Sequence, residues 1–244
     1  MKKKTIPGKE VEPDQASFYR YNGEIHFTAD GTSYVGDLVI PVAARFIVIF
    51  SHGIGSSRHS VRNHKVAHLL NKKKIATLLV SLDKVEESLF NHGHSIQYLV
   101  NHLRAITRWV RHDSLTHHLA IGYFGASAGA AVALAAAAHE KGIVSAVVCR
   151  GGRPDLAMTE LDKVDMPVLL LIGSKDDDGI AMNEWAAEHL HSHAEIKIID
   201  GASHLFEEKG KLREVADIAS DWFRIHMTEE HERSLETMRT MRLA

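Results

Sequence analysis

Residues 119–130 read LAIGYFGASAGA, and this stretch decides the fold. An apolar run, Leu119–Phe124, leads directly into Gly125-Ala126-Ser127-Ala128-Gly129. These five residues match G-x-S-x-G, a pattern in which a serine occupies a sharp turn between a strand and a helix. Only glycine and alanine flank the serine, as such a strained turn requires. The segment therefore predicts a buried strand, a turn that presents Ser127, and a helix that packs close to a sheet.

Short apolar runs alternate with helical segments on both sides of this stretch. Two N-terminal runs, Glu24–Ala29 and Ser33–Ile40, form an expected antiparallel pair across the Asp30-Gly31 turn. The other expected strands are Arg45–Phe50, Ile75–Val80, Leu119–Phe124, Val144–Cys149, Val168–Ile172 and Ile196–Ile199.

Segments with helical periodicity lie between these strands. Apolar residues recur at i, i+3, i+4 and i+7 over residues 96–110 and again over 212–223. Ser60 is a candidate N-cap for a helix that runs through Leu70. The alternation predicts an α/β fold with a mostly parallel central sheet and helices on both faces.

Length and segment spacing predict how the chain is divided. We expect an N-terminal arm over residues 1–20, one domain over 21–226, and a charged helical extension over 227–244. The connection from Cys149 to Val168 is too short for a helical lid, so no substantial lid domain is expected. The one other loop long enough to cover a site is residues 84–95.

Composition excludes several classes of protein. The formal net charge is −2, which gives no electrostatic case for a nucleic-acid or acidic-membrane partner. No apolar run is long enough for a transmembrane helix, and no apolar segment of a signal peptide follows the N-terminal lysines. The single cysteine, Cys149, excludes an intrachain disulfide framework and indicates a reducing compartment. We therefore expect a cytoplasmic protein.

Three chemically useful side chains follow the expected strands. A hydroxyl (Ser127), a carboxylate and an imidazole (His204) follow three different strands, in that order along the chain. Open α/β sheets carry their sites at the carboxyl ends of the strands, so the three groups should meet. Together they have the composition of a Ser-His-Asp triad. The carboxylate could be Asp176, Asp177 or Asp178, because the three are adjacent and only one can orient the imidazole.

The backbone N–H groups of an oxyanion hole are expected nearby. One belongs to Ala128, the residue after the serine, at the positive end of a helix. The second should come from the His52–Gly55 loop, and Ile54 is the candidate.

Three arginines lie in loops at the same edge. Arg58, Arg150 and Arg153 are candidates for binding a carboxylate or phosphate of a substrate. Alternatively they are structural and pair with Asp155, Asp162 or the three adjacent aspartates. The histidine groups have no ligand partners at a known metal spacing, so no metal and no cofactor is expected.

Four motifs together resemble the α/β-hydrolase superfamily. They are residues 51–60 (SHGIGSSRHS), 124–130 (FGASAGA), 150–156 (RGGRPDL) and 201–208 (GASHLFEE). The chain is similar to the dienelactone-hydrolase-related group, small hydrolases found alone or fused to phosphoribosyltransferase domains. In this group the acid lies three residues after the first glycine of the loop that follows the acid-bearing strand. Counting from Gly173, this resemblance implies Asp176. Two departures are a serine where dienelactone hydrolases proper have a cysteine, and Ile54 where the group has a small residue.

The resemblance implies a serine hydrolase that cleaves a small ester, thioester or lactone through an acyl-enzyme on Ser127. One alternative is a non-catalytic protein of the same fold that uses the pocket for a ligand or partner. A further alternative is an interaction subunit of a nucleotide-metabolising assembly. The C-terminal helix would serve that role, or would make a homo-oligomer. The expected ligand is a small molecule, with no nucleic acid and no membrane.

Overall fold

The computed structural model describes residues 18–53, 57–82 and 96–243, with side chains as far as Thr228. Within this part of the chain, eight strands form one sheet in the order β1-β2-β4-β3-β5-β6-β7-β8. β1 and β2 are antiparallel and β2 is antiparallel to β4, whereas all neighbours from β4 to β8 are parallel. The strands are β1 (Tyr19–Ala29), β2 (Thr32–Pro41), β3 (Phe46–Ser51), β4 (Ala76–Val80), β5 (Ala120–Ala126), β6 (Val144–Arg150), β7 (Val168–Gly173) and β8 (Ala194–Ile199).

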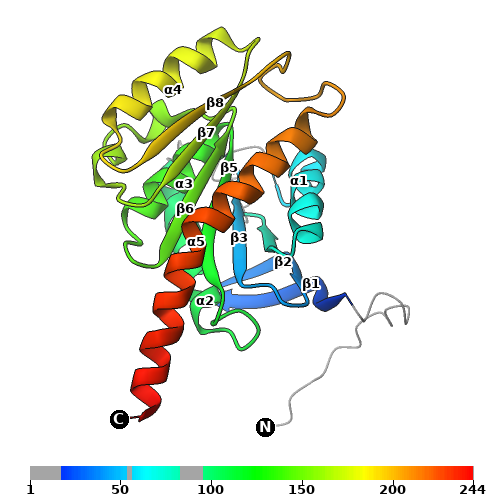
Figure 1. Cartoon of the computed structure of the whole chain (residues 1–244), viewed down its shortest axis with the longest axis vertical. Helices are drawn as coiled ribbons and strands as arrows, with labels where there is room; N and C mark the ends of the chain where they lie inside the picture. The colour runs from blue at the N-terminus through cyan, green and yellow to red at the C-terminus, as the bar shows by residue number, and fades with distance from the viewer. Residues whose placement is uncertain (1–17, 54–56, 83–95, 244) are drawn as a thin grey trace.

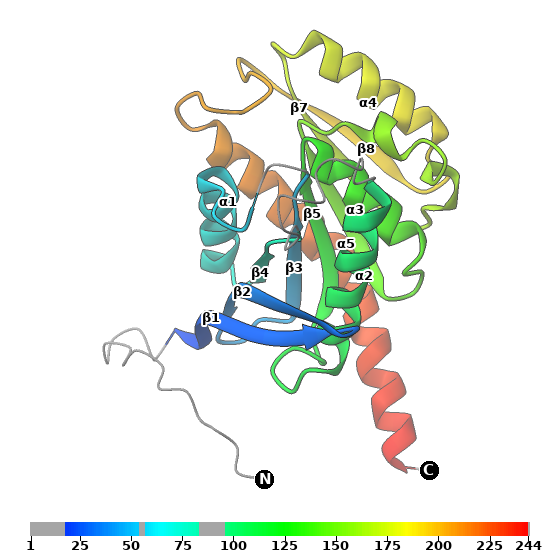
Figure 2. The ribbon, with the colours of Figure 1, turned by 180° about the vertical axis from the view of Figure 1, so that it is seen from behind.

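Helices cover both faces of this sheet (Figures 1 and 2). α1 and α5 pack on one face, and α2, α3 and α4 pack on the other. The helices are α1 (Val61–Lys72), α2 (Ile96–His112), α3 (Ala128–Ala138), α4 (Asp177–His189) and α5 (Lys211–Leu243). The expected mostly parallel sheet with helices on both faces is confirmed.

Local sequence features explain where α1 begins, how β1 turns into β2 and which strands are central. Ser60 caps α1, since its hydroxyl accepts a hydrogen bond from the N–H of Asn63 at 3.4 Å. Asp30 and Gly31 both have positive φ, 45° and 76°, which is the backbone that a two-residue hairpin between β1 and β2 requires. Strands β3, β4, β6 and β7 are buried along their whole length, as expected for central strands covered on both faces.

No helical lid interrupts the connection between β6 and β7. This segment holds two short 3-10 helices, η2 (Pro154–Ala157) and η3 (Leu161–Lys163). Both 3-10 helices pack against α3 and α4, so this connection forms no lid domain, as expected. The second loop considered for a lid, residues 84–95, lies outside the described residues.

The expected segment boundaries at both ends fall inside regular elements. β1 already begins at Tyr19, so the last two residues of the expected arm are part of the sheet. α5 continues without a break through residue 226, and Met227 is fully buried against the sheet. The burial of Met227 is explained by Gly122 of β5, where a Cβ would lie 3.0 Å from the Met227 sulfur. The C-terminal part of α5 then runs past the body of the sheet (Figures 1 and 2).

Candidate active site

Ser127 occupies the turn between β5 and α3. Its φ of 51° and ψ of −127° lie in a region that side chains rarely adopt, which costs on the order of 1–3 kcal/mol. The turn leaves Ser127 exposed, although β5 before it and α3 after it are almost entirely buried. A strained backbone thus holds a reactive group at the surface of a rigid core.

Two glycines let the backbone close around this turn. A Cβ on Gly125 would lie 2.6 Å from Cα of Ala130. A Cβ on Gly129 would lie 2.5 Å from the carbonyl oxygen of Ser51 at the end of β3. Both distances are shorter than any normal contact, so the first turn of α3 can approach β3 and β5 only because these residues are glycines.

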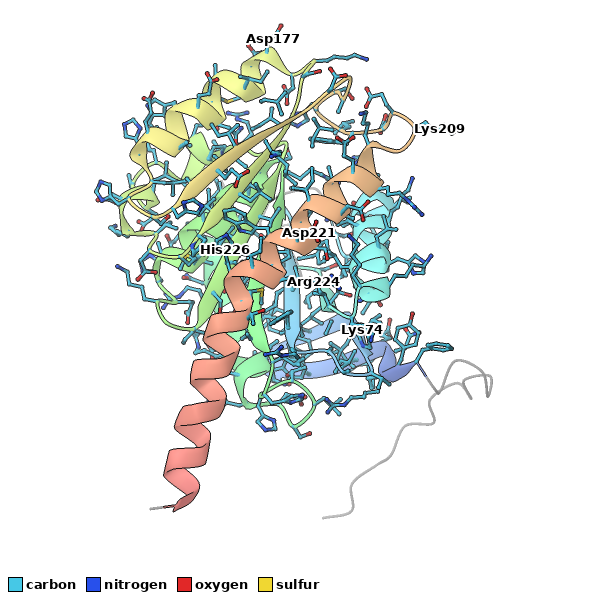
Figure 3. All side chains as sticks on the ribbon, in the orientation of Figure 1. Lys74, Asp177, Lys209, Asp221, Arg224 and His226 are labelled. Carbon is cyan, nitrogen blue, oxygen red and sulfur yellow. The ribbon has the colours of Figure 1, made fainter. Side chains whose placement is uncertain are left out.

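His204 and Asp176 form a direct pair at the same edge of the sheet. His204 Nδ1 lies 2.7 Å from Asp176 Oδ2, and the Asp176 side chain is only 12% exposed. The other carboxylate oxygen of Asp176 accepts a hydrogen bond from the N–H of Gly179 at 3.2 Å and so caps α4. Asp177 and Asp178 are exposed in the first turn of α4, and Figure 3 labels Asp177 at the end of this helix. Of the three adjacent aspartates, Asp176 is the one bonded to the imidazole.

The end of β6 connects this pair to Ser127. The N–H of Ser127 donates to the carbonyl of Arg150 at 3.1 Å. A Cβ on the next residue, Gly151, would lie 2.7 Å from the carbonyl oxygen of His204 and 3.6 Å from its Nδ1. Ser127 and His204 therefore contact the same short segment, Arg150–Gly151.

The loop after β3 packs against the residue that follows the serine. A Cβ on Gly53 would lie 2.6 Å from Cβ of Ala128. Ala128 begins α3, so its N–H has no carbonyl partner within the helix. Ile54, the expected second oxyanion donor, lies outside the described residues.

Two positioning residues were not singled out from the sequence. His52 is buried; its Nε2 accepts from the N–H of Leu82 at 2.8 Å, so Nδ1 carries the proton and donates to the carbonyl of Gly53 at 3.0 Å. His52 thereby ties the loop after β3 to the end of β4. The position of His52 between a buried strand and a glycine is the sequence signal that could have indicated this role.

Asn183 makes a similar connection on the other face. Its side chain is buried in α4 and donates to the carbonyls of Gly152 and Gly179 at 3.1 and 2.8 Å. It therefore joins the turn after β6 to the helix that Asp176 caps. In the sequence, an amide three residues before Ala186, on the same face of the helix, is the signal that could have indicated this role of Asn183.

The three candidate arginines have different environments. Arg58 forms ion pairs with Asp37 and Glu24 at 2.5 and 2.8 Å, close to β1 and β2. Arg153 binds both oxygens of Asp155, at 2.9 and 2.8 Å. Asp155 is one of the partners expected in the structural alternative, whereas Asp37 and Glu24, which bind Arg58, were not among them. Arg150 is buried and has no such partner among the described residues.

The described residues hold neither a metal-binding cluster nor a membrane-spanning helix. They contain no group of three or more histidine, cysteine, aspartate or glutamate side chains that could hold a metal ion. None of the described helices is long and apolar enough to cross a membrane.

The mostly parallel sheet, the strained serine turn and the His-Asp pair at the edge of the sheet are features of the α/β-hydrolase fold. Residues 82–233 match the Dienelactone hydrolase family, and the chain belongs to this family.

Solved structures give the same architecture. The chain is 44% identical to a dienelactone hydrolase from Anabaena variabilis, with a TM-score of 0.81 over 85% of this chain and 98% of the other. Est1E from Butyrivibrio proteoclasticus shares the fold at 16% identity, with a TM-score of 0.69 over 84% of this chain and 98% of that one.

Two curated relatives are considerably longer. Proteins of two Mycobacterium tuberculosis strains, both named as phosphoribosyl transferases, are 42% identical over 206 residues. The match covers 84% of this chain and 46% of theirs, so the chain spans about half the length of these relatives.

Proposed function

We propose that this protein is a serine hydrolase that cleaves a small ester, thioester or lactone through an acyl-enzyme on Ser127. The observation that carries this proposal is the 2.7 Å bond between His204 Nδ1 and Asp176 Oδ2, beside a serine held in a strained exposed turn. Family membership supports the class of reaction. The phosphoribosyl transferase name is not carried over, because the matched residues belong to the hydrolase family.

The hydrogen bond to Asp176 determines which imidazole nitrogen can act as a base. Because Nδ1 donates to the carboxylate, Nε2 has the lone pair that can accept the proton of the Ser127 hydroxyl. The serine oxygen then bonds to the carbonyl carbon, and the C=O electron pair moves onto the oxygen. When this intermediate collapses, the bond to the leaving group breaks and the imidazolium gives its proton to that group.

Hydrolysis of the acyl-enzyme repeats these steps with water. Nε2 of His204 takes a proton from water, the resulting hydroxide adds to the acyl carbon, and Ser127 leaves with the proton returned by the imidazolium. The N–H of Ala128 would stabilise the oxyanion in both halves, supported by the dipole of α3. Ile54 remains the proposed second donor.

An activity-based label tests this proposal directly. A fluorophosphonate should form a covalent adduct with the wild-type protein, and tandem mass spectrometry should locate it on Ser127. Ser127→Ala should abolish labelling, whereas Ser203→Ala, which changes a neighbouring loop serine, should keep it. An unlabelled wild-type protein would instead indicate the alternative, a non-catalytic member of the fold that binds a ligand or partner.

Self-association and location are further proposals. We propose that the C-terminal helical segment, residues 227–244, makes a homo-oligomer, because α5 continues past the sheet as far as Leu243 (Figure 2). Light scattering should give a mass above that of one chain, and truncation after Thr228 should reduce it to one chain. A cytoplasmic location is proposed from the single buried cysteine.

A further inference from the structure

His204 lies in a loop between β8 and α5 (Figure 1). β8 ends at Ile199 and α5 begins at Lys211, and the residues between them belong to no helix or strand. A catalytic base must be held to within about 0.5 Å of its working position. Contacts other than those of regular secondary structure must therefore fix the backbone on both sides of His204.

Before His204, the chain is bonded to the turn that carries Asp176. The N–H of Lys175 donates to the carbonyl of Ala202 at 3.0 Å, and Ala202 itself is fully buried. Because Lys175 directly precedes Asp176, this bond holds the segments of the imidazole and of its carboxylate partner together. It acts as far as Ala202, and Ser203, the last residue before His204, is bonded in a different way.

Ser203 is held by residues that follow His204. Its N–H donates to Oε1 of Glu208 at 3.0 Å, and its carbonyl accepts from the N–H of Phe206 at 3.1 Å. Phe206 is fully buried with a φ of 57°, a backbone conformation that costs a residue with a side chain about 1–3 kcal/mol. The turn through Phe206 brings Glu208 back to Ser203, so the loop closes around His204.

Glu208 is also bonded to the start of α5. Its carbonyl accepts the N–H of Lys211, the first residue of this helix, at 3.1 Å. The helix then packs on the sheet through buried side chains, beginning with Leu212. Hydrogen bonds from the N–H of Glu208 itself and then from that of Ser203 lower the pKa of the Glu208 carboxyl, so the ionised form accepts near neutral pH. Glu208 thus connects a buried helix to the residue before His204.

We propose that Glu208 is a positioning residue for His204. Its carboxylate holds the N–H of Ser203 and so fixes the backbone from which the imidazole reaches Asp176. The inference rests on the proposed function, because the position of the imidazole affects the reaction only where His204 acts as the base. A backbone N–H can donate to any oxygen at this place, so the role depends on the reach of the side chain and not on its charge.

The rate of fluorophosphonate labelling tests this role. In that reaction the Ser127 oxygen bonds to phosphorus, fluoride leaves, and Nε2 of His204 takes the serine proton. Intact-protein mass spectrometry gives both the fraction finally labelled and the second-order rate constant. Glu208→Ala should be labelled completely but about tenfold or more slowly, because a small displacement of the base slows proton transfer. Glu208→Gln, whose amide oxygen has the same reach, should keep the rate constant within about threefold of the wild-type value.

Glu207→Ala is the matched control, because it removes the neighbouring carboxylate, which binds Arg62 and not the backbone of the loop. This variant should keep the rate constant within about twofold. A purely structural role of Glu208 would lower the labelled fraction or the Tm and leave the rate constant of the folded protein unchanged. An unchanged rate constant in Glu208→Ala, or an equally low one in Glu208→Gln, would overturn the proposal. A wild-type protein that takes no label refutes the proposed function instead.

A comparison of Glu208→Asp with Glu208→Gln covers the case in which Glu208→Ala does not fold. Aspartate keeps the negative charge but is one methylene shorter, whereas glutamine keeps the reach without the charge. Glu208→Asp should therefore be labelled about tenfold or more slowly than Glu208→Gln. The opposite order would assign the effect to the charge of Glu208, and equal rate constants would show that its reach is irrelevant. Either result would overturn the proposal.

Discussion

At the residue scale, the geometry of the site depends on which hydrogen-bond partner each polar atom has. Both oxygens of Asp176 are occupied, one by His204 Nδ1 and one by the N–H of Gly179. The carboxylate thus fixes the imidazole and the start of α4 together. Its neighbours Asp177 and Asp178 are exposed, and it is Asp176 that is bonded to the imidazole of His204.

Asparagine substitutions at the three aspartates should therefore have unequal effects. Asp176→Asn should lower kcat for a small ester by on the order of 10³–10⁴, because an amide NH₂ can favour the wrong imidazole tautomer. Asp177→Asn and Asp178→Asn should change kcat by less than about twofold, since both side chains are exposed. Steady-state kinetics on the three variants checks this. Equal small effects at all three positions would assign the orienting acid elsewhere.

The single thiol should take no part in the reaction. Cys149 is fully buried at the end of β6, and burial raises its pKa to about 12. The thiolate is the reactive form, so the native protein should resist iodoacetamide near neutral pH. Thiol titration should show reaction only after unfolding, and Cys149→Ala should keep the esterase activity. Rapid inactivation of the native enzyme by the reagent, lost in Cys149→Ala, would contradict this expectation.

At the element scale, close approach between backbones determines where the serine lies. The first turn of α3 contacts the end of β3 and packs beside Gly53, so the serine turn and the loop after β3 meet within one small volume. His52 and Asn183 hold the loops around it by side-chain bonds to the backbone. The site is consequently sensitive to small changes of volume in its glycines.

Gly129→Ala should test this packing. The new Cβ would lie 2.5 Å from the Ser51 carbonyl, so the first turn of α3 must shift, at a cost of about 1–3 kcal/mol or more. Gly23→Ala is the control, because in β1 the nearest atom to a Cβ is 3.9 Å away. Denaturant unfolding measures both variants. Comparable stability of the two would show that the turn has room to relax.

The sequence predicted the elements better than their contacts. Buried strands such as Arg45–Phe50 and Val144–Cys149 were found because runs of apolar residues reflect burial on both faces. The serine turn at Gly125–Gly129 was found because its glycines and serine lie within five consecutive residues. Asp155, the partner of Arg153, lies two residues away and could be named from the sequence. The partners of Arg58 and the roles of His52 and Asn183 depend on contacts between distant segments, for which spacing along the chain carries no signal.

At the scale of the whole molecule, the segments that cover Ser127 determine how large a substrate can be buried. The β6–β7 connection contains only short 3-10 helices, so this part of the described chain forms no helical cover over Ser127. Each methylene transferred from water to an apolar pocket contributes about 0.8 kcal/mol of binding free energy. A site without a cover cannot bury a long acyl chain and so does not gain this free energy. We therefore expect small, water-soluble substrates.

A series of 4-nitrophenyl esters checks this expectation. The acetate and butyrate should have higher kcat/KM values than the palmitate, and added lipid should not activate the enzyme. Measurements below the micelle concentration of each ester keep the comparison free of interfacial effects. A clear preference for the palmitate would indicate that residues 84–95 fold over the site as a lid.

The length of α5 has a practical consequence for handling this molecule. The helix begins at Lys211, directly after the loop that carries His204, and its 33 residues extend for roughly 50 Å. Its last turns lie at the opposite end of the molecule from the labelled loop residue Lys209 (Figure 3). A dye, bead or electrode attached at the last turn would be separated from the loop of His204 by the length of this helix. Immobilised in that orientation, the protein would present the loop of His204 to the solution.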